Sequence, residues 1–142
     1  MNTYDPNYVS KKSFAIVAQK AIITNSDHKI LVLQRSEKSG AGGKWSLPGG
    51  ALEHGEEPLE AMRREIREET KLTVHAAMPF HAKSYINDAG DFVVIIGYLC
   101  KVESDEVSLN WEHDAFAWLT KNEALLLDLT SDGKTFIEQF TP

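Results

Sequence analysis

The sequence predicts an α/β sandwich, and two features of the chain support this prediction. Apolar runs of strand length recur along most of the 142 residues and are separated by turn signals. Segments with helical periodicity interrupt these runs near the middle of the chain and again toward its C-terminal end. Strands that are joined by hairpins and separated by helices favour a layered fold over a uniform, doubly wound sheet.

Length and composition limit the classes of protein to which the chain can belong. A length of 142 residues predicts a single domain over 1–142, with hydrophobic and charged contents of 42% and 25% that are ordinary for a globular protein. The net charge of −6 argues against nonspecific binding to nucleic acid, and the longest apolar run, 92–100, is too short to span a bilayer. The single cysteine, Cys100, cannot form an internal disulfide, and residues 1–6 lack the features of a secretory signal. We therefore expect a cytoplasmic protein with no nucleic-acid partner and no membrane partner.

The strands are predicted from apolar runs that are bounded by turn residues. The nearly continuous apolar run 92–102 predicts a central strand that is buried on both faces. Turns are expected at 25–28 and 88–91, and the glycine-rich segment 36–44 predicts a mobile loop at the rim of the fold. Strands are expected over 13–24, 29–35, 45–47, 73–76, 80–87 and 92–102, with a further short strand that ends at Trp118.

Helices are expected over 59–70, 122–127 and 130–140. The first of these contains no helix-breaking residue. It follows Pro58, which suits the first helical position because an N–H group there would have no partner. The apolar residues that share one stripe of this helix, and should face the core, are Leu59, Met62 and Ile66. Either Ser131 or Asp132 is expected to cap the last helix.

A neighbouring face of the helix over 59–70 carries three glutamates, Glu65, Glu68 and Glu69, at positions i, i+3 and i+4. Like charges at this spacing repel each other by about a few tenths of a kcal/mol per pair. Mg²⁺, Mn²⁺ or Ca²⁺ would relieve this repulsion, because hard cations prefer oxygen ligands. On their own, however, the three glutamates are more typical of a solvated acidic face, since arginines are interspersed among them.

The residues around these glutamates favour the metal site, because the whole stretch resembles the Nudix box. That pattern is a glycine, five residues, a glutamate, seven residues, and then Arg-Glu-apolar-any-Glu-Glu-any-Gly-apolar. The sequence supplies Gly50, Glu56 and the run 64–72, and the preceding 45–50 also resembles the usual entry into the box. Lys71 is the one departure, since it stands where the pattern has a glycine. Such a glycine often adopts a left-handed conformation, which would cost a lysine roughly 1 kcal/mol, so the departure concerns the end of the helix and not the carboxylates.

The resemblance implies an α/β/α sandwich with a mixed sheet and a pyrophosphohydrolase that depends on Mg²⁺ or Mn²⁺. Glu68 and Glu69 are implied as the principal metal ligands, and Glu65 as either a ligand or the general base. Arg64 would orient a carboxylate through paired hydrogen bonds, and Glu56 would support the site. The implied ligands are the carbonyl group of Gly49 and the carboxylates of Glu65, Glu68, Glu69 and Glu112.

Four candidate site residues lie outside the box, and each of them could instead have an ordinary structural role. Glu112 is either the ligand from elsewhere in the chain or a polar loop residue. Arg35 ends a strand where members of this family often carry an arginine that reaches substrate phosphate, and it equally suits an ordinary strand-end charge. Phe80 and Tyr85 lie near loops, where an aromatic ring could stack on a base, although core packing is the commoner role of aromatic residues.

The resemblance also implies a small-molecule nucleotide substrate, a nucleoside diphosphate linked to another group. Among such substrates we expect a (d)NTP or a modified nucleotide, cleaved to a nucleoside monophosphate and pyrophosphate, because a compact domain has little material to bind a second substrate half. The alternatives are a hydrolase of ADP-sugars or dinucleotides, a non-hydrolysing nucleotide-binding regulator, and an ordinary interaction domain. The intact set of carboxylates argues against the regulator, and the length of the box match argues against the interaction domain. The expected state is a monomer or a homodimer.

Overall fold

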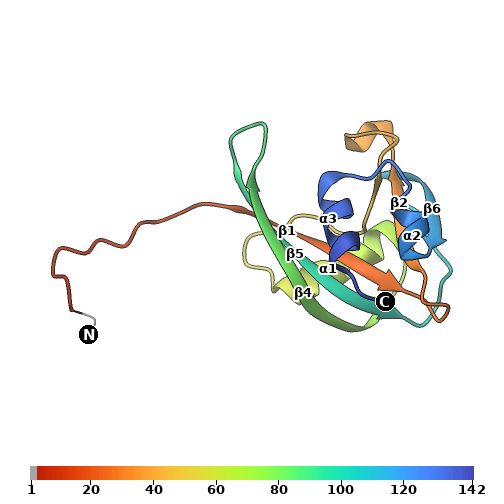
Figure 1. Ribbon diagram of the computed structural model, residues 1–142, viewed down its shortest axis with the longest axis horizontal. Coiled ribbons are helices and arrows are strands. Elements are labelled where there is room, and N and C mark those ends of the chain that lie inside the picture. The colour runs from red at the N-terminus through yellow and green to blue at the C-terminus, as the bar shows by residue number, and fades with distance from the viewer. Residues whose placement is uncertain (1–2) are drawn as a thin grey trace.

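The structure, a computed structural model, describes residues 3–142, so residues 1–2 of the predicted domain lie outside the described residues. The strands of this part of the chain are β1 (Ile16–Thr24), β2 (Ile30–Arg35), β3 (Trp45–Ser46), β4 (Val74–Ile86), β5 (Phe92–Val102) and β6 (His113–Leu119). They form one sheet with the order β3-β2-β1-β5-β4, and β6 pairs with the other side of β2 (Figure 1). β1 and β5 are parallel and the remaining pairs are antiparallel, so the sheet is mixed, as the sequence predicts.

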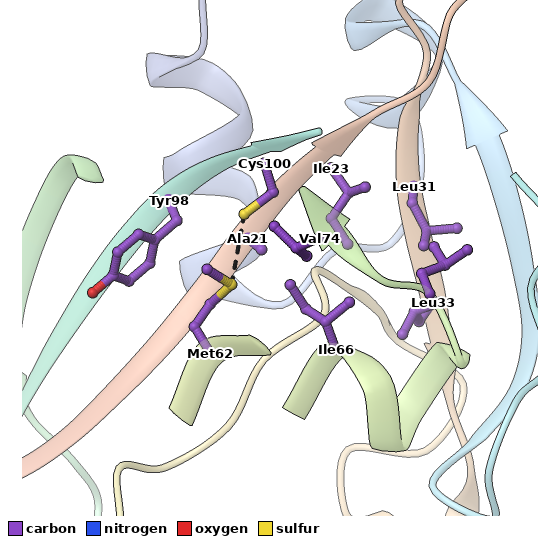
Figure 2. Packing of buried hydrophobic residues seen from close by; sticks show 10 residues of the cluster. Ala21, Ile23, Leu31, Leu33, Met62, Ile66, Val74, Tyr98 and Cys100 are labelled. Carbon is purple, nitrogen blue, oxygen red and sulfur yellow. Dashed lines mark hydrogen bonds between the residues drawn. The ribbon is translucent and has the colours of Figure 1, made fainter. Parts of the chain in front are cut away.

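Helices cover both faces of this sheet: α1 (Pro58–Thr70) lies on one face, and α2 (Lys121–Ala124) and α3 (Ser131–Gln139) lie on the other. Met62 and Ile66 of α1 pack against alternate residues of β1 and β2 (Figure 2). Phe136 and Ile137 of α3 pack against the intervening residues of the same strands, which point the other way. The predicted α/β/α sandwich is therefore confirmed.

The central strand β5 contributes to both of these cores. Tyr98 and Cys100 join the core under α1, whereas Val93 and Ile95 join the core under α3, so the predicted burial of both faces is confirmed. The Cys100 thiol donates a hydrogen bond to the sulfur of Met62 at 3.6 Å, and burial raises the pKa of that thiol to about 12. Cys100 is therefore a packing residue without thiolate character.

β1 begins at Ile16, later than the predicted start at residue 13. Ile16 pairs with Val93, and β5 itself begins one residue earlier at Phe92, so the preceding residues have no strand beside them. Residues 3–15 instead extend away from the body of the molecule (Figure 1). Of the helices within residues 3–142, none is both long enough and apolar enough to cross a membrane.

β4 is one strand, whereas the sequence predicts two separate strands over 73–76 and 80–87. Pro79 pairs with Tyr98 and His81 pairs with Gly97, so Phe80 is an extra residue in a β-bulge. Proline is tolerated here because, among the described strands, β4 pairs only with β5 and forms an edge of the sheet. The prediction of two separate strands was wrong. Proline ordinarily ends a strand, but the bulge next to Pro79 lets β4 continue past it.

The predicted position of the last helix is nearly correct, but its predicted caps are not. Thr130 has an extended backbone, and its hydroxyl oxygen accepts a hydrogen bond from the backbone N–H of Gly133 at 3.4 Å. Thr130 is therefore the N-cap, because Ser131 and Asp132 already belong to the first turn of α3. The other C-terminal helix, α2, ends at Ala124, three residues earlier than the predicted end at 127.

The loop over 36–44 has structure of its own, since it includes the 3₁₀ turn η1 (Glu37–Ser39). The backbone N–H of Arg35 donates to the carbonyl of Lys44, and the N–H of Gly43 donates to the carbonyl of Arg35, each at 2.9 Å. These two hydrogen bonds close the loop at its base.

Residue 71, at the end of α1, has the left-handed conformation that a glycine at this position of the box often adopts. Lys71 has φ 63° and ψ 6°, the left-handed conformation, and its backbone N–H donates to the carbonyl of Arg67 at 3.0 Å. The helix therefore ends as it would with a glycine, and the lysine Cβ carries the strain of that conformation.

Replacing Lys71 with glycine should stabilise the protein by about 0.5–1 kcal/mol, because it removes this strain. Urea unfolding of Lys71→Gly beside the parent protein measures the difference. Lys71→Ala is the matched control, since it removes the charge and the long side chain but keeps the strained Cβ. Equal stabilisation by both variants would show that the side chain, and not the backbone conformation, was responsible.

Candidate active site

The turn formed by Pro48, Gly49 and Gly50 runs directly against β1. The N–H of Gln19 donates to the carbonyl of Gly50, and the N–H of Ala21 donates to the carbonyl of Pro48, each at 2.9 Å. Gly49 has φ +140°, and a Cβ there would lie 2.0 Å from the carbonyl oxygen of Gln19. A larger residue would push the turn away from the strand, so glycine is needed for this close approach.

The same turn receives two glutamates from α1. A Cβ at Gly50 would lie 2.6 Å from the carboxyl carbon of Glu65, so this glycine leaves room for that side chain. The Glu69 carboxylate accepts a hydrogen bond from the backbone N–H of Gly49 at 2.9 Å. Both glycines of the turn and both glutamates of the helix therefore meet at one place.

Burial sets the charge of these two glutamates. Glu69 is only 3% exposed, and its burial raises its pKa to about 8, although Lys20 and the N–H of Gly49 act in the opposite direction. Burial also raises the pKa of Glu65, while the neighbouring charge of Arg64 lowers it. Two acids whose pKa values are raised by burial do not form the solvated face that the three glutamates alone favoured.

The Arg64 guanidinium contacts three carboxylates of this region. Its Nε and Nη2 donate to the two oxygens of Glu56 at 3.0 and 2.9 Å, and this pairing lowers the pKa of Glu56. Its Nη1 lies 3.1 Å from Glu65 and 3.3 Å from Glu68. The guanidinium has therefore the geometry of the orienting group that the family resemblance implies.

Glu112, from the loop before β6, lies on the same side of the molecule as these carboxylates. Its negative charge raises the pKa of both Glu65 and Glu69, and its own carboxylate accepts a hydrogen bond from the Asn110 amide at 3.1 Å. Its backbone carbonyl accepts from the N–H of Ser36 at 2.8 Å, so the loop over 36–44 helps to position it.

These donors suit a divalent cation in their chemistry, although the side chains do not converge on one point. Among residues 3–142, no three Asp, Glu, His or Cys side chains are close enough together to hold a metal ion. The reason is that Glu56 and Glu68 turn toward Arg64, and Glu69 turns toward the N–H of Gly49. All the donors are oxygen atoms, which is the set that Mg²⁺ or Mn²⁺ prefers, and a cation would stabilise the buried Glu69 and the half-buried Glu65.

The three predicted substrate-binding residues have different surroundings. Arg35 donates from Nε to the carbonyl of Gly40 at 2.7 Å and from Nη2 to the carbonyl of Ser39, so part of its guanidinium is bound to the loop. Phe80 packs against Phe136 of α3, with ring centroids 6.1 Å apart. Tyr85 lines a pocket of about 240 Å³, whose other lining residues are Lys83, Ser131 and Asp132.

Two further residues of this region, Lys20 and His113, were not predicted from the sequence as site residues. The Lys20 ammonium donates to the carbonyl of Leu47 at 3.3 Å. His113 is buried, and burial, together with the charges of Arg35 and Lys20, lowers its pKa to about 4. A signal for Lys20 exists in the sequence, because it is the one charged residue inside the apolar strand 16–24.

Without metal, the stability of the fold should fall as the pH rises toward 8. The pKa of Glu69 is about 8 in the folded protein against an ordinary value of 4.5, so between these values the folded state keeps a proton that the unfolded state has lost. The stabilisation from this proton is complete below the lower value and is lost as the pH rises through the higher one, by at most about 1.4 kcal/mol per pH unit.

Denaturant unfolding in EDTA at several pH values between about 6.5 and 8 tests this dependence. Glu69→Gln has no group that titrates at this position and should lose that part of the slope. Identical slopes for the two proteins would show that Glu69 is ionised throughout.

Comparisons with known proteins agree with this arrangement. A family model described as the NUDIX domain matches residues 16–140. The nucleoside triphosphatase NudI of Enterobacter sp. (strain 638) is 31% identical over 118 residues, which are 76% of this chain and 84% of that protein. The MutT protein of Methanosarcina mazei Go1 superimposes with a TM-score of 0.76 at 29% identity and covers 92% of this chain and 95% of its own. The MutT NUDIX hydrolase of Burkholderia pseudomallei gives 0.77 at 27% identity, over 91% of this chain and 100% of its own.

The matched segment begins with β1 and ends just after α3, so it contains the whole sheet, the helices on both faces and the turn that meets Glu65 and Glu69. Members of this family generally need a divalent metal. The chain belongs to the NUDIX family and is a hydrolase that acts on phosphoanhydride bonds.

Proposed function

We propose that this protein is a metal-dependent pyrophosphohydrolase that cleaves nucleoside triphosphates, including modified ones, to nucleoside monophosphates and pyrophosphate. The observation that carries the proposal is that α1 directs two acids at the Gly49-Gly50 turn, the buried Glu69 and the half-buried Glu65. A buried carboxylate is costly unless a cation or hydrogen bonds compensate it, and a divalent ion would compensate both. The name of the Enterobacter relative, a nucleoside triphosphatase, supports the choice of substrate class.

In this proposal the chain's own residues have distinct roles. Glu68 and Glu69 are the principal metal ligands, and Glu112 and the carbonyl of Gly49 complete the set. Glu65 is either a further ligand or the general base that takes a proton from the attacking water. Arg64 orients the carboxylates, as its hydrogen bonds to Glu56 and Glu68 favour. When bound, Mg²⁺ or Mn²⁺ would neutralise phosphate charge and lower the pKa of a bound water.

The pocket beside Tyr85 is our candidate for the nucleoside end of the substrate. Tyr85 is 40% exposed, and the ammonium of Lys83 lies 5.6 Å from the centre of its ring. Burial and the charge of Asp132, at the start of α3, raise the pKa of Tyr85, so an acceptor, a phenol and an ammonium meet in this pocket. Such a mixture of a ring and polar groups suits a nucleobase.

Three further points are part of the proposal. Residues 1–142 form one NUDIX domain, in agreement with the span of the family match over 16–140. The protein works in the cytoplasm, and it is a monomer or a homodimer. Its partner is the nucleotide substrate itself.

Product analysis tests the reaction directly. With Mg²⁺ or Mn²⁺, a panel of (d)NTPs and modified nucleotides should give nucleoside monophosphate and pyrophosphate in equal amounts, and excess EDTA should abolish turnover. Release of a nucleoside diphosphate and inorganic phosphate would contradict cleavage at this position. Including ADP-sugars and dinucleotides in the panel tests the alternative substrates, and nucleotide binding without any turnover would indicate the regulator.

The carboxylates should be separable from folding by mutation. Glu68→Gln keeps the size of a side chain that is 53% exposed and removes a charge that holds the cation, so kcat should fall by a factor on the order of 10²–10³ with little change in stability. Ile66→Ala is the contrasting control on the core face of the same helix. Ile66 is fully buried, so this variant should lose about 2–5 kcal/mol of stability while the folded enzyme keeps most of its kcat. Near-normal turnover by Glu68→Gln at saturating Mg²⁺ would exclude the role given to this residue.

A further inference from the structure

Lys20 occupies an unusual place for a lysine, in the middle of the central strand β1. The residues on both sides of it, Gln19 and Ala21, are completely buried. Their N–H groups bind the carbonyls of Gly50 and Pro48, so the turn of the active site is attached to the strand immediately before and after Lys20. Lys20 itself is half-buried, and a charged side chain is uncommon between two completely buried strand residues.

The Lys20 side chain emerges beside that turn. A Cβ on Gly49 would lie 3.0 Å from the Cα of Lys20, and the Lys20 ammonium reaches the carbonyl of Leu47, the residue just before the turn. The N–H of Gly49 in the same turn donates to the Glu69 carboxylate, so the turn brings the ammonium close to a proposed metal ligand. The ammonium therefore faces the region where the proposed metal ligands meet.

The ammonium has unused hydrogen-bonding capacity there. Within residues 3–142, its one hydrogen bond is the 3.3 Å bond to Leu47, and no carboxylate lies within ion-pair distance of it. An ammonium has three donors, so donors remain available for an oxygen-rich ligand. Arg35, the cation expected to bind phosphate, already donates two of its N–H groups to its own loop.

We propose that Lys20 is a substrate-binding residue that donates to a phosphate oxygen of the bound nucleotide, next to the metal-binding carboxylates. This inference rests on the proposed function, since it requires a phosphorylated substrate at the Gly49-Gly50 turn. Lysine is suited to the task because its compact charge pairs with phosphate without the fixed geometry that arginine demands.

A purely structural role for Lys20 gives a different result on mutation. If the ammonium only offset the charge of Glu69, its removal would change folding stability and leave the affinity for substrate unchanged. If it binds phosphate, its removal raises KM and weakens the binding of pyrophosphate, the proposed product. Lys20→Met separates these roles because it keeps the length and apolar character of the side chain while removing the charge.

The experiment compares Lys20→Met and Lys20→Arg with the parent enzyme and with Lys101→Met, an exposed lysine on the neighbouring strand β5. We expect Lys20→Met to raise KM for the best nucleoside triphosphate, and the Kd for pyrophosphate in Mg²⁺ measured by calorimetry, by about tenfold or more. Lys20→Arg should recover part of both losses, and Lys101→Met should match the parent.

The inference is wrong if Lys20→Met keeps KM and the Kd for pyrophosphate within about twofold of the parent, whether or not its melting temperature changes. If the parent enzyme turns over nucleoside triphosphates in the same assay, only the role given to Lys20 is wrong and the proposed function stands. A parent protein that neither hydrolyses any nucleotide nor binds pyrophosphate would overturn both.

Discussion

The close approach between the Gly49-Gly50 turn and β1 is the contact on which the rest of this site depends. It is possible only because position 49 has no Cβ, and it brings the turn between the sheet and the C-terminal half of α1. Once the turn is there, one N–H of its backbone is available to Glu69, and the Cα of Gly50 leaves room for Glu65. The positions of the helix carboxylates thus follow from a backbone contact that involves no catalytic group.

The electrostatics of the site follow from that geometry. α1 uses one side for a core of Met62 and Ile66 and the adjacent side for acids that are only partly solvated. Arg64 binds Glu56, Glu65 and Glu68, whereas Glu69 is left with one backbone donor, the N–H of Gly49. An acidic interior of this kind destabilises the folded state, and proteins commonly retain such groups where a ligand compensates them.

The sequence was sufficient for those parts of the structure that depend on local interactions. The limits of α1 and its core stripe of Leu59, Met62 and Ile66 follow from spacing and residue type over a few turns, whereas the left-handed end at residue 71 was suggested only by the glycine of the Nudix box. The grouping of the glutamates was also predictable, because helix geometry fixes it. The resemblance to the Nudix box added the turn to this set.

The remaining features depend on contacts between distant parts of the chain, which spacing does not reveal. The start of β1 is determined by where β5 begins, because Ile16 pairs with Val93, which lies 77 residues later in the chain. The position of Lys20 beside Glu69 depends on the attachment of the turn to the strand. The surroundings of Phe80 depend on a bulge that no local signal marks, apart from the neighbouring proline.

That bulge has a consequence for the far end of β4. Side chains of a strand alternate between the two faces of the sheet, so one inserted residue exchanges the faces of everything that follows. Because Phe80 is inserted, Lys83 and Tyr85 pair with Ile95 and Val93 and share their face, the one under α3 where Asp132 lies. Without the inserted residue, both side chains would point toward the face of α1. One inserted residue in β4 therefore decides which side chains line the pocket beside α3, although that residue lies several positions away from the residues that line it.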